Sequence, residues 1–260
     1  MRTNLSSQIS LNRVSPRYYR PENAVERSVL TRLEKIPTNI FETIDEGVVQ
    51  ITNEIVAKIQ DRQREGKFCT IAVGTGASLR PLFAELIRKH KDEGVSFRNV
   101  VFFNLYEYYP LTDEAGSSFN HLNKLFLSQI DIDRQNIFTM DGTIPQEAIT
   151  EHCRLYEQRI QTFGGIDIVI MGVGREGNIG MNEPGSHASS TTRLILIDAT
   201  SRSEAAHNIG VDNLPPCSIT MGISTILGAR KVYLLAWGED KADIIRSAVE
   251  DKVSDTLPAS

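Results

Sequence analysis

Five short apolar runs, each bounded by turn-forming residues, alternate along the chain with segments of helical periodicity. The runs are FCTIAV (68–73), VVFFN (100–104), IDIVIM (166–171), LILI (194–197) and KVYLLAW (231–237). Continuous apolar runs of this length predict strands that are buried on both faces. Helical patterns between several of them cover 79–90, 118–130, 146–162 and 239–250. This alternation predicts right-handed crossovers and a doubly wound, mostly parallel α/β sheet with helices on both faces.

Two helical segments precede the first strand. Apolar residues recur at helical spacing over 23–35 and again over 39–64, and Pro37 separates the two segments. Residues 1–21 show no period and predict an arm. We therefore expect two parts, an N-terminal arm and helix (residues 1–38) and one α/β domain (residues 39–260).

Composition and charge exclude several classes of protein. The 260 residues are 40% hydrophobic and 23% charged, which is ordinary for a globular chain and excludes disordered and fibrous classes. The net charge of −5, without a dense basic run, argues against nucleic acid as a partner. Three widely spaced cysteines fit neither a disulfide framework nor a CxxC metal site. No apolar signal core or membrane span is evident, so we expect a cytoplasmic protein without membrane contact.

The loop after the first strand, GTGAS (74–78), has the composition of a phosphate-binding turn. In a doubly wound sheet, ligands bind at the carboxyl ends of the strands. Small residues let the backbone approach a ligand, and free N–H groups at a helix start attract phosphate. A tight strand-to-helix turn with Ser78 as the N-cap is the alternative interpretation. The GxxxxGK[ST] motif of a P-loop is absent.

A second loop, beginning at 172–177, matches GxGxxG, and Asp198 follows at the distance typical of dinucleotide-binding proteins. That motif requires a helix from its last glycine, whereas Gly180 and Pro184 interrupt any helix here. A nicotinamide cofactor is therefore not expected. A long loop around a polar ligand is favoured over a merely solvated loop. Its polar residues are Glu176, Asn178, Asn182 and Glu183.

The third loop, LYEYYP (105–110), places Glu107 among aromatic side chains. A partly desolvated carboxylate is a better base, but an exposed Glu107 beside packed tyrosines is the simpler interpretation. The five histidines show no metal-binding spacing, and no GxSxG motif marks a serine hydrolase. We expect no metal and no cofactor.

Together, the segments FNLYEYYPL, GVGREGNIGMNEPGS and GTGAS resemble the glucosamine-6-phosphate deaminase/isomerase family, which includes the 6-phosphogluconolactonases. The similarity runs from about residue 40 to the C-terminus in the family's order. It continues in CRLYEQRI, STTR, SITMG and GEDKA. The resemblance implies a doubly wound α/β fold and a six-carbon sugar 6-phosphate as ligand, without a redox cofactor.

The resemblance also assigns catalytic positions, and these depart from the deaminase pattern. Deaminases carry an aspartate that moves a proton between C1 and C2 of the sugar, and this chain has Tyr106 there. Deaminases also carry an aspartate, and after it a histidine that helps to open the sugar ring; this chain has Glu176 and Asn178 at these two positions. Glu183 of the NEP motif is retained, and Glu107 is the other candidate base. In an extended segment, Glu107 would point away from Tyr106.

The phosphate-binding positions match the family better. The small-residue loop is retained, and Lys241 of GEDKA resembles a phosphate-binding lysine. His207 aligns with an arginine that contacts phosphate in the deaminases. The candidate phosphate-binding residues are therefore Thr75, Gly76, Ala77, Ser78, Lys241 and His207.

Three functions remain open at this point. The first is an enzyme acting on a hexosamine or hexose 6-phosphate, with deamination impaired at Tyr106 and Asn178. The second is a sugar-phosphate-binding or regulatory domain without catalysis. The third is a lactonase or isomerase for a related phosphosugar. A homo-oligomer stays open, as does a fused C-terminal domain, because DKVSDTLPAS stops where family members continue into a final strand.

Overall fold

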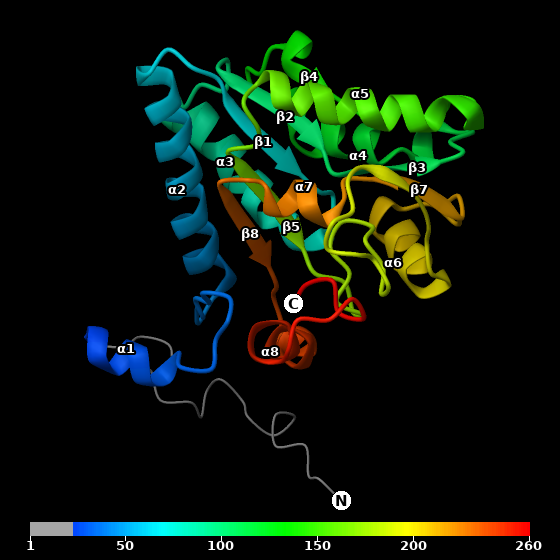
Figure 1. The fold of residues 1–260 in the computed structure, drawn as a ribbon. Helices are drawn as coiled ribbons and strands as arrows, with labels where there is room; N and C mark the ends of the chain where they lie inside the picture. Colours follow the sequence, from blue (N-terminus) through cyan, green and yellow to red (C-terminus); the bar gives the residue numbers. More distant parts are fainter. Residues whose placement is uncertain (1–22) are drawn as a thin grey trace, which may run out of the picture.

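A five-stranded parallel sheet forms the centre of the molecule (Figure 1), in a computed structural model that describes residues 23–260. Its strands, in spatial order, are β4 (Ile137–Phe138), β2 (Val100–Asn104), β1 (Cys69–Val73), β5 (Ile168–Gly172) and β8 (Lys231–Leu235). The register aligns Ile71 of β1 with Phe102 on one side and Ile168 on the other. The predicted doubly wound, mostly parallel fold is confirmed, and four of the five apolar runs supply its strands.

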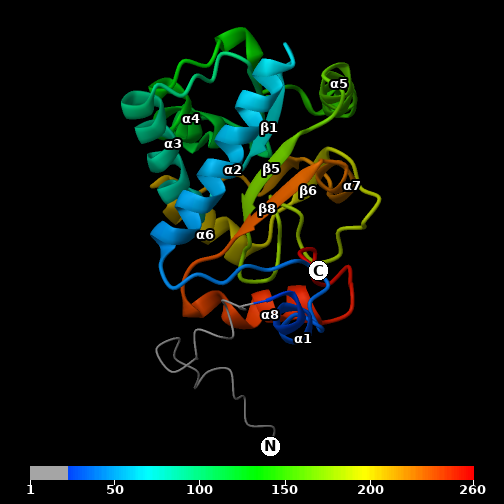
Figure 2. The same ribbon diagram turned by 90° about the vertical axis from the view of Figure 1, so that its left-hand side faces the viewer.

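Helices cover both faces of this sheet (Figure 2). One face packs against α2 (Ile44–Arg64), α3 (Arg80–Glu93) and α4 (Ser118–Leu125). The other packs against α5 (Ile149–Thr162), α7 (Ile223–Leu227) and a second sheet. Ile71 and Phe102 face the first layer, while Ala72 and Phe103 face the second. Two-sided burial therefore explains why these strands are apolar throughout rather than alternating.

The second sheet is antiparallel, with β3 (Tyr106–Tyr109), β7 (Cys217–Thr220) and β6 (Arg193–Leu196) in that order. Two predictions were wrong here. The LILI run forms edge strand β6 instead of a buried parallel strand, and Leu196 is 73% exposed. The segment 105–110, expected to be a loop, is mostly strand β3. Short apolar runs do not reveal their pairing partner, which explains the first error.

The turn before α3 differs from the capped helix start that was considered. Residues Ala77–Leu79 form a short 3₁₀ turn, and α3 begins only at Arg80, with Pro81 in its first turn. Ser78 therefore lies inside the turn and caps nothing. Its carbonyl instead accepts a hydrogen bond from the indole of Trp237 at 2.7 Å, which ties the turn to the end of the sheet.

The remaining helices are α1 (Ala24–Leu30), α6 (Ala199–Ile209) and α8 (Ala242–Glu250). Helix α1 is shorter than the predicted 23–35, and α4 ends at Leu125 with a 3₁₀ turn after it. The predicted arm at 1–21 lies outside the described residues, and the division at residue 38 stays a prediction. Within residues 23–260, every helix is too short or too polar to cross a bilayer.

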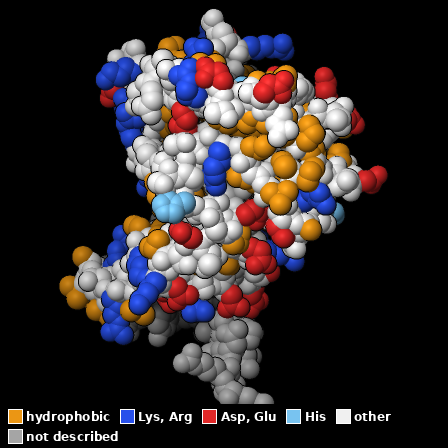
Figure 3. Space-filling model, turned by 45° about the vertical axis from the view of Figure 1, so that its right-hand side comes forward, with side chains coloured by type: hydrophobic (Ala, Val, Ile, Leu, Met, Phe, Trp, Pro, Cys, Tyr) orange, Lys and Arg blue, Asp and Glu red, His pale blue; other side chains and the backbone are white. Residues whose placement is uncertain are grey.

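The surface carries an area where apolar side chains gather, with acidic side chains below it (right side of Figure 3). Exposed apolar residues of the described chain include Leu155, Leu196 and Leu227. The homo-oligomer considered from the sequence stays a prediction.

Candidate functional site

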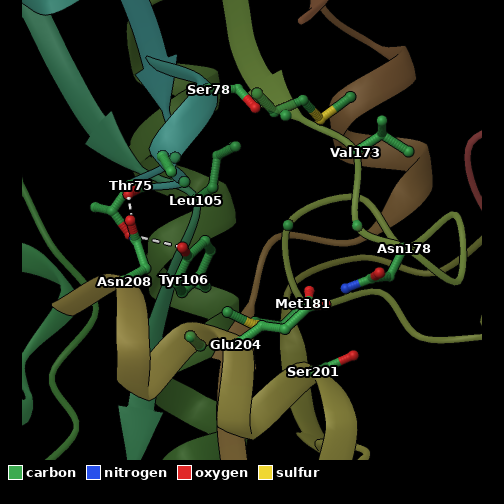
Figure 4. A pocket seen from close by; sticks show the side chains of 18 of the residues that line it. Thr75, Ser78, Leu105, Tyr106, Val173, Asn178, Met181, Ser201, Glu204 and Asn208 are labelled. Carbon is green, nitrogen blue, oxygen red and sulfur yellow. Dashed lines mark hydrogen bonds between the residues drawn. The ribbon is translucent and has the colours of Figure 1, made fainter. Parts of the chain in front are cut away.

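A cavity of about 390 Å³ lies at the carboxyl ends of β1 and β5 (Figure 4). Its volume falls in the range of about 300–1,000 Å³ that small-molecule sites occupy. Eight of the predicted site residues line it, namely Thr75, Gly76, Ala77, Ser78, Tyr106, Asn178, His207 and Lys241. Glu107, Glu176 and Glu183 do not. The structure thus brings the predicted phosphate-binding residues together and separates the carboxylates from them.

The loop 74–78 presents unused backbone donors to this cavity. Within the described chain, the N–H groups of Gly76, Ala77 and Ser78 donate to no protein acceptor. The loop itself is held in place, because the Asn208 side-chain amide donates to the Thr75 carbonyl at 2.8 Å. Free N–H groups ahead of the 14-residue helix α3 suit an anion.

Tyr106 forms part of one wall of the cavity, beside Thr75 and Asn208 (Figure 4). Its hydroxyl lies 2.6 Å from Thr75 Oγ1, which is itself 3.1 Å from Ser118 Oγ. Burial raises the pKa of Tyr106, so the phenol stays protonated at neutral pH. Tyr106 can donate or accept a hydrogen bond, but it is not equipped to remove a proton from carbon.

Asn178 occupies another wall and comes from the long loop that follows β5 (Figure 4). The expected glycine-rich irregular loop is present. A Cβ at Gly174 would lie 1.7 Å from Asn178 Oδ1, so only glycine fits beside this side chain. The C-terminal segment supports the same loop, since the Ala259 N–H donates to the Gly177 carbonyl at 2.9 Å. The Asn178 side chain thus packs closely against Gly174 on a supported loop, but its amide group does not ionise at physiological pH.

Glu183 lies one side chain away from the cavity, half-buried behind Ser201. The Ser201 hydroxyl donates to Glu183 Oε2 at 3.2 Å. Its other oxygen, Oε1, is buried and meets no hydrogen-bond partner in residues 23–260. Burial, together with the charges of Asp198 and Glu176, raises the pKa of Glu183. A carboxyl group of this kind can hold a proton closer to neutral pH than an exposed one.

The structure gives Glu107 no place in the cavity, so its role as a candidate base needs correction. Its side chain is 2% exposed and accepts hydrogen bonds from the Ser117 hydroxyl and from the N–H groups of Tyr108, Ser118 and Phe119. Neighbouring residues of a strand point to opposite faces, and Tyr106 takes the cavity side. Glu107 therefore holds the start of α4.

Glu176 is exposed on the loop after β5 and also lies outside the cavity wall. Its neighbour Arg175 pairs with Glu204 of α6 at 2.7 Å, and Glu204 does line the cavity. Sequence reasoning missed several polar cavity residues, among them Arg80, Ser201, Glu204 and Asn208. Three of them follow from the position of α6, which no local pattern predicts. Arg80 was detectable, because it lies two residues after the predicted phosphate loop.

Across residues 23–260, no three His, Cys, Asp or Glu side chains cluster in a way that could hold a metal ion. The polar groups at the cavity include hydroxyls, amides, three cationic or imidazole side chains, the Glu204 carboxylate in the wall and the Glu183 carboxyl group next to it. The other side chains concerned are Tyr106, Thr75, Asn178, Arg80, Lys241 and His207.

Residues 42–260 match the family described as glucosamine-6-phosphate isomerases/6-phosphogluconolactonase. The chain belongs to this family. The resemblance inferred from the loop motifs is thereby confirmed, and the match covers the sheet, the cavity and all the candidate site residues.

Two curated proteins of this family show how similar the chain is in sequence to its relatives. A glucosamine-6-phosphate deaminase-like protein of Bacteroides thetaiotaomicron is 62% identical over the whole chain, which spans only 40% of that relative's length. A glucosamine-6-phosphate deaminase of Bacillus velezensis is 33% identical over 85% of this chain and 88% of its own.

Solved structures of the family share the fold. A monomeric glucosamine-6-phosphate deaminase superposes with a TM-score of 0.78 at 30% identity, covering 84% of this chain and 89% of its own. A 6-phosphogluconolactonase from Thermotoga maritima superposes with a TM-score of 0.64 at 19% identity, covering 82% and 88%. The second likeness concerns the fold alone.

Proposed function

We propose that this family member binds a hexosamine or hexose 6-phosphate in the cavity at the ends of β1 and β5. The observation that carries the proposal is the convergence of three free N–H groups with Lys241 on a cavity of suitable size. The phosphate would contact the loop 75–78, and the sugar would extend toward Tyr106 and Asn178. The named deaminase relatives support a phosphosugar as the ligand class.

Deamination by this chain is then strongly reduced. Converting an amino sugar to a ketose and ammonia requires groups that accept and donate protons at carbon and at the ring oxygen. Tyr106 stays protonated, and Asn178 does not titrate. Loss of one positioned acid–base group costs about 10²–10⁴ in rate. Binding is therefore the function that the geometry supports best, which makes the chain a sugar-phosphate-binding or regulatory domain.

Calorimetry with three sugars tests the proposal. Glucosamine 6-phosphate and glucose 6-phosphate should bind, and glucosamine should bind much more weakly because it lacks the phosphate. Lys241→Met should weaken both phosphosugars without affecting the thermal stability of the free protein. Equal affinity for glucosamine and its 6-phosphate would refute the assignment of the phosphate site.

A second candidate, residual catalysis, is favoured by Glu183. Its buried and unpartnered Oε1 gives the chain one carboxyl group whose pKa is raised next to the cavity. Ammonia release from glucosamine 6-phosphate that disappears in Glu183→Gln would establish a deaminase. Hydrolysis of 6-phosphogluconolactone, measured in the same way, would instead establish a lactonase. Absence of both reactions leaves the binding function.

The cellular location of the protein and its cooperation with further sequence are also proposals. Soluble phosphosugars are cytoplasmic metabolites, so we infer a cytoplasmic location. This chain spans 40% of the length of the Bacteroides relative, and we propose that a domain of this kind acts together with further sequence in such a longer polypeptide. The test is to add glucosamine 6-phosphate to the longer Bacteroides relative and to measure whether any catalytic activity of the rest of that polypeptide changes.

A further inference from the structure

Arg80 is a cavity residue to which neither the loop motifs nor the relatives' names give a role. It is the first residue of α3 and follows the loop 74–78 after a single 3₁₀ turn. Its side chain lines the same cavity as Ser78 and Lys241. A guanidinium is thus present beside the free N–H groups that the proposed function assigns to the phosphate.

The hydrogen bonds of Arg80 leave most of its donors available. One terminal nitrogen donates to the carbonyl of Asn208 at 2.6 Å and to Asn208 Oδ1 at 3.0 Å. No carboxylate in residues 23–260 pairs with Arg80, whereas the nearby Arg175 is paired with Glu204. A guanidinium carries five N–H donors in a planar fork that matches phosphate oxygens. The second terminal nitrogen and Nε of Arg80 therefore have no protein acceptor among the described residues.

Charge balance in the cavity indicates why a second cation is needed. A phosphate monoester carries about −1.5 to −2 charges at neutral pH. Lys241 supplies one positive charge, and Glu204, the one carboxylate that residues 23–260 contribute to the cavity wall, is paired with Arg175. Arg80 supplies the second positive charge, so the two together match the ligand. His207 is the remaining titratable side chain of the wall, with Tyr106 and Tyr108 protonated.

We propose that Arg80 is a phosphate-binding residue that works with Lys241 and the N–H groups of 76–78. The inference rests on the proposed function and adds the residue that selects phosphorylated over neutral sugars. Asn208 fixes the geometry, because it accepts from Arg80 and donates to the Thr75 carbonyl at 2.8 Å. Arg80 can keep that bond with one nitrogen while the rest of its fork contacts the phosphate.

Three substitutions separate phosphate binding from a structural role. Arg80→Gln keeps a donor for the Asn208 carbonyl but removes the charge, Arg80→Lys keeps the charge without the fork, and Arg80→Met removes both. Calorimetry with glucosamine 6-phosphate and with glucosamine gives the ratio of the two affinities. We expect Arg80→Met and Arg80→Gln to weaken the phosphosugar about tenfold and glucosamine hardly at all. The affinity of Arg80→Lys for glucosamine 6-phosphate should lie between that of these two variants and that of the wild type.

Arg88→Met is the matched control, since it makes the same charge change on the same helix. Arg88 lies about 12 Å further along α3 and is paired with Glu85 and Glu93. This variant should retain wild-type affinity. Thermal unfolding without ligand shows which variants are folded, and Arg80→Gln or Arg80→Lys replaces Arg80→Met if the latter is not.

The outcomes distinguish this inference from the proposed function. If Lys241→Met loses phosphosugar binding while Arg80→Met and Arg80→Gln keep it, the role of Arg80 is refuted and the binding function stands. Wild-type affinity in Arg80→Gln alone would assign Arg80 a structural bond to Asn208 and likewise refute it. If the wild-type protein binds no phosphosugar, both proposals fail together.

Discussion

Glu107 and Glu183 are two carboxylates withdrawn from solvent, and they differ in how many hydrogen-bond donors surround them. Glu107 accepts from three backbone N–H groups and one hydroxyl. Glu183 Oε2 accepts from the Ser201 hydroxyl, and the Oε1 atom of Glu183 has no hydrogen-bond partner in residues 23–260. Burial raises the pKa of both groups. Both oxygens of the Glu107 carboxylate are thus hydrogen-bonded within the fold, whereas one oxygen of Glu183 is not.

The difference indicates which carboxylate is available for chemistry. A carboxylate bound by four donors stabilises the backbone around it, and it can release them only by disrupting that backbone. A carboxyl group with a free, buried oxygen can gain or lose a proton without breaking hydrogen bonds. Incompletely satisfied polar groups with shifted pKa values are found preferentially at functional sites. Glu183 fits that description, and Glu107 does not.

The largest effect is expected from Glu107→Ala. This change leaves the Ser117 hydroxyl and three backbone N–H groups without their acceptor in a buried site. We expect the free energy of unfolding to fall by about 3–5 kcal/mol, measured by urea denaturation. Glu107→Gln, which keeps one acceptor oxygen, should cost less. A loss below about 1 kcal/mol in the alanine variant would mean that Glu107 does not hold this part of the fold.

Restoring the missing acid–base groups should have the next largest effect. Tyr106→Asp combined with Asn178→His supplies two titrating groups inside the cavity. We expect ammonia release from glucosamine 6-phosphate to rise by about 10²-fold over the wild type. Adding Glu183→Gln to the double variant should abolish most of the gain if Glu183 takes part. Each single variant is the control, and an unchanged rate in a folded double variant would place the impairment elsewhere.

Glu183→Gln should stabilise the protein in a pH-dependent way. Because burial and the charge of Asp198 hold the pKa of Glu183 above its unfolded value, ionising this group destabilises the folded state. This loss of folding stability is absent below about pH 4, where Glu183 is protonated in both states, and it is complete once the pH exceeds the raised pKa. The free energy of unfolding of Glu183→Gln, measured by urea denaturation, should therefore exceed that of the wild type by about 0.5–2 kcal/mol at pH 7 and should equal it at pH 4. A gain of equal size at both pH values would contradict this account.

The smallest expected effect is that of Ser201→Ala on Glu183. The Ser201 hydroxyl donates to Glu183 Oε2, and this hydrogen bond lowers the pKa of that carboxyl group, as does the backbone of Asp198. Removing the hydroxyl should raise the pKa of Glu183 further, with stability changed by less than about 1 kcal/mol. Carbon-13 NMR of the labelled carboxyl group measures the shift. No movement of the pKa would show that the contact with Ser201 does not control Glu183.

The sequence predicted the parts of the fold that depend on local pattern. Strands β1, β2 and β5 were recognisable because each is buried on both faces and is therefore largely apolar. Strand β8 lies at the edge of the sheet and is only partly buried, but its apolar run was recognisable as well. The loop 74–78 and the helix after it were predicted from small residues followed by a helical period. Strand β3 was missed because its partner β7 lies more than 100 residues away, and YEYY alone gives no sign of that pairing.

The site was predictable to the extent that it depends on strand ends. Parallel strands place their carboxyl ends at one edge, which brought Thr75, Tyr106 and Asn178 together as expected. Strand alternation also predicted correctly that Glu107 points away from Tyr106. The environment of Glu183 was not predictable, because Ser201 belongs to α6 and meets it only through tertiary packing.

The wall that carries Asn178 depends on residues far along the chain. Ala259 donates to Gly177, and the N–H of Gly185 donates to the Asp255 carbonyl at 2.7 Å. Residues 172–186 are therefore supported by a separate stretch of polypeptide that lies 70 to 82 positions later at the two contacts. A graft of this loop into another family member would carry over its amino acids without their support, so loop and supporting segment must be exchanged as a pair.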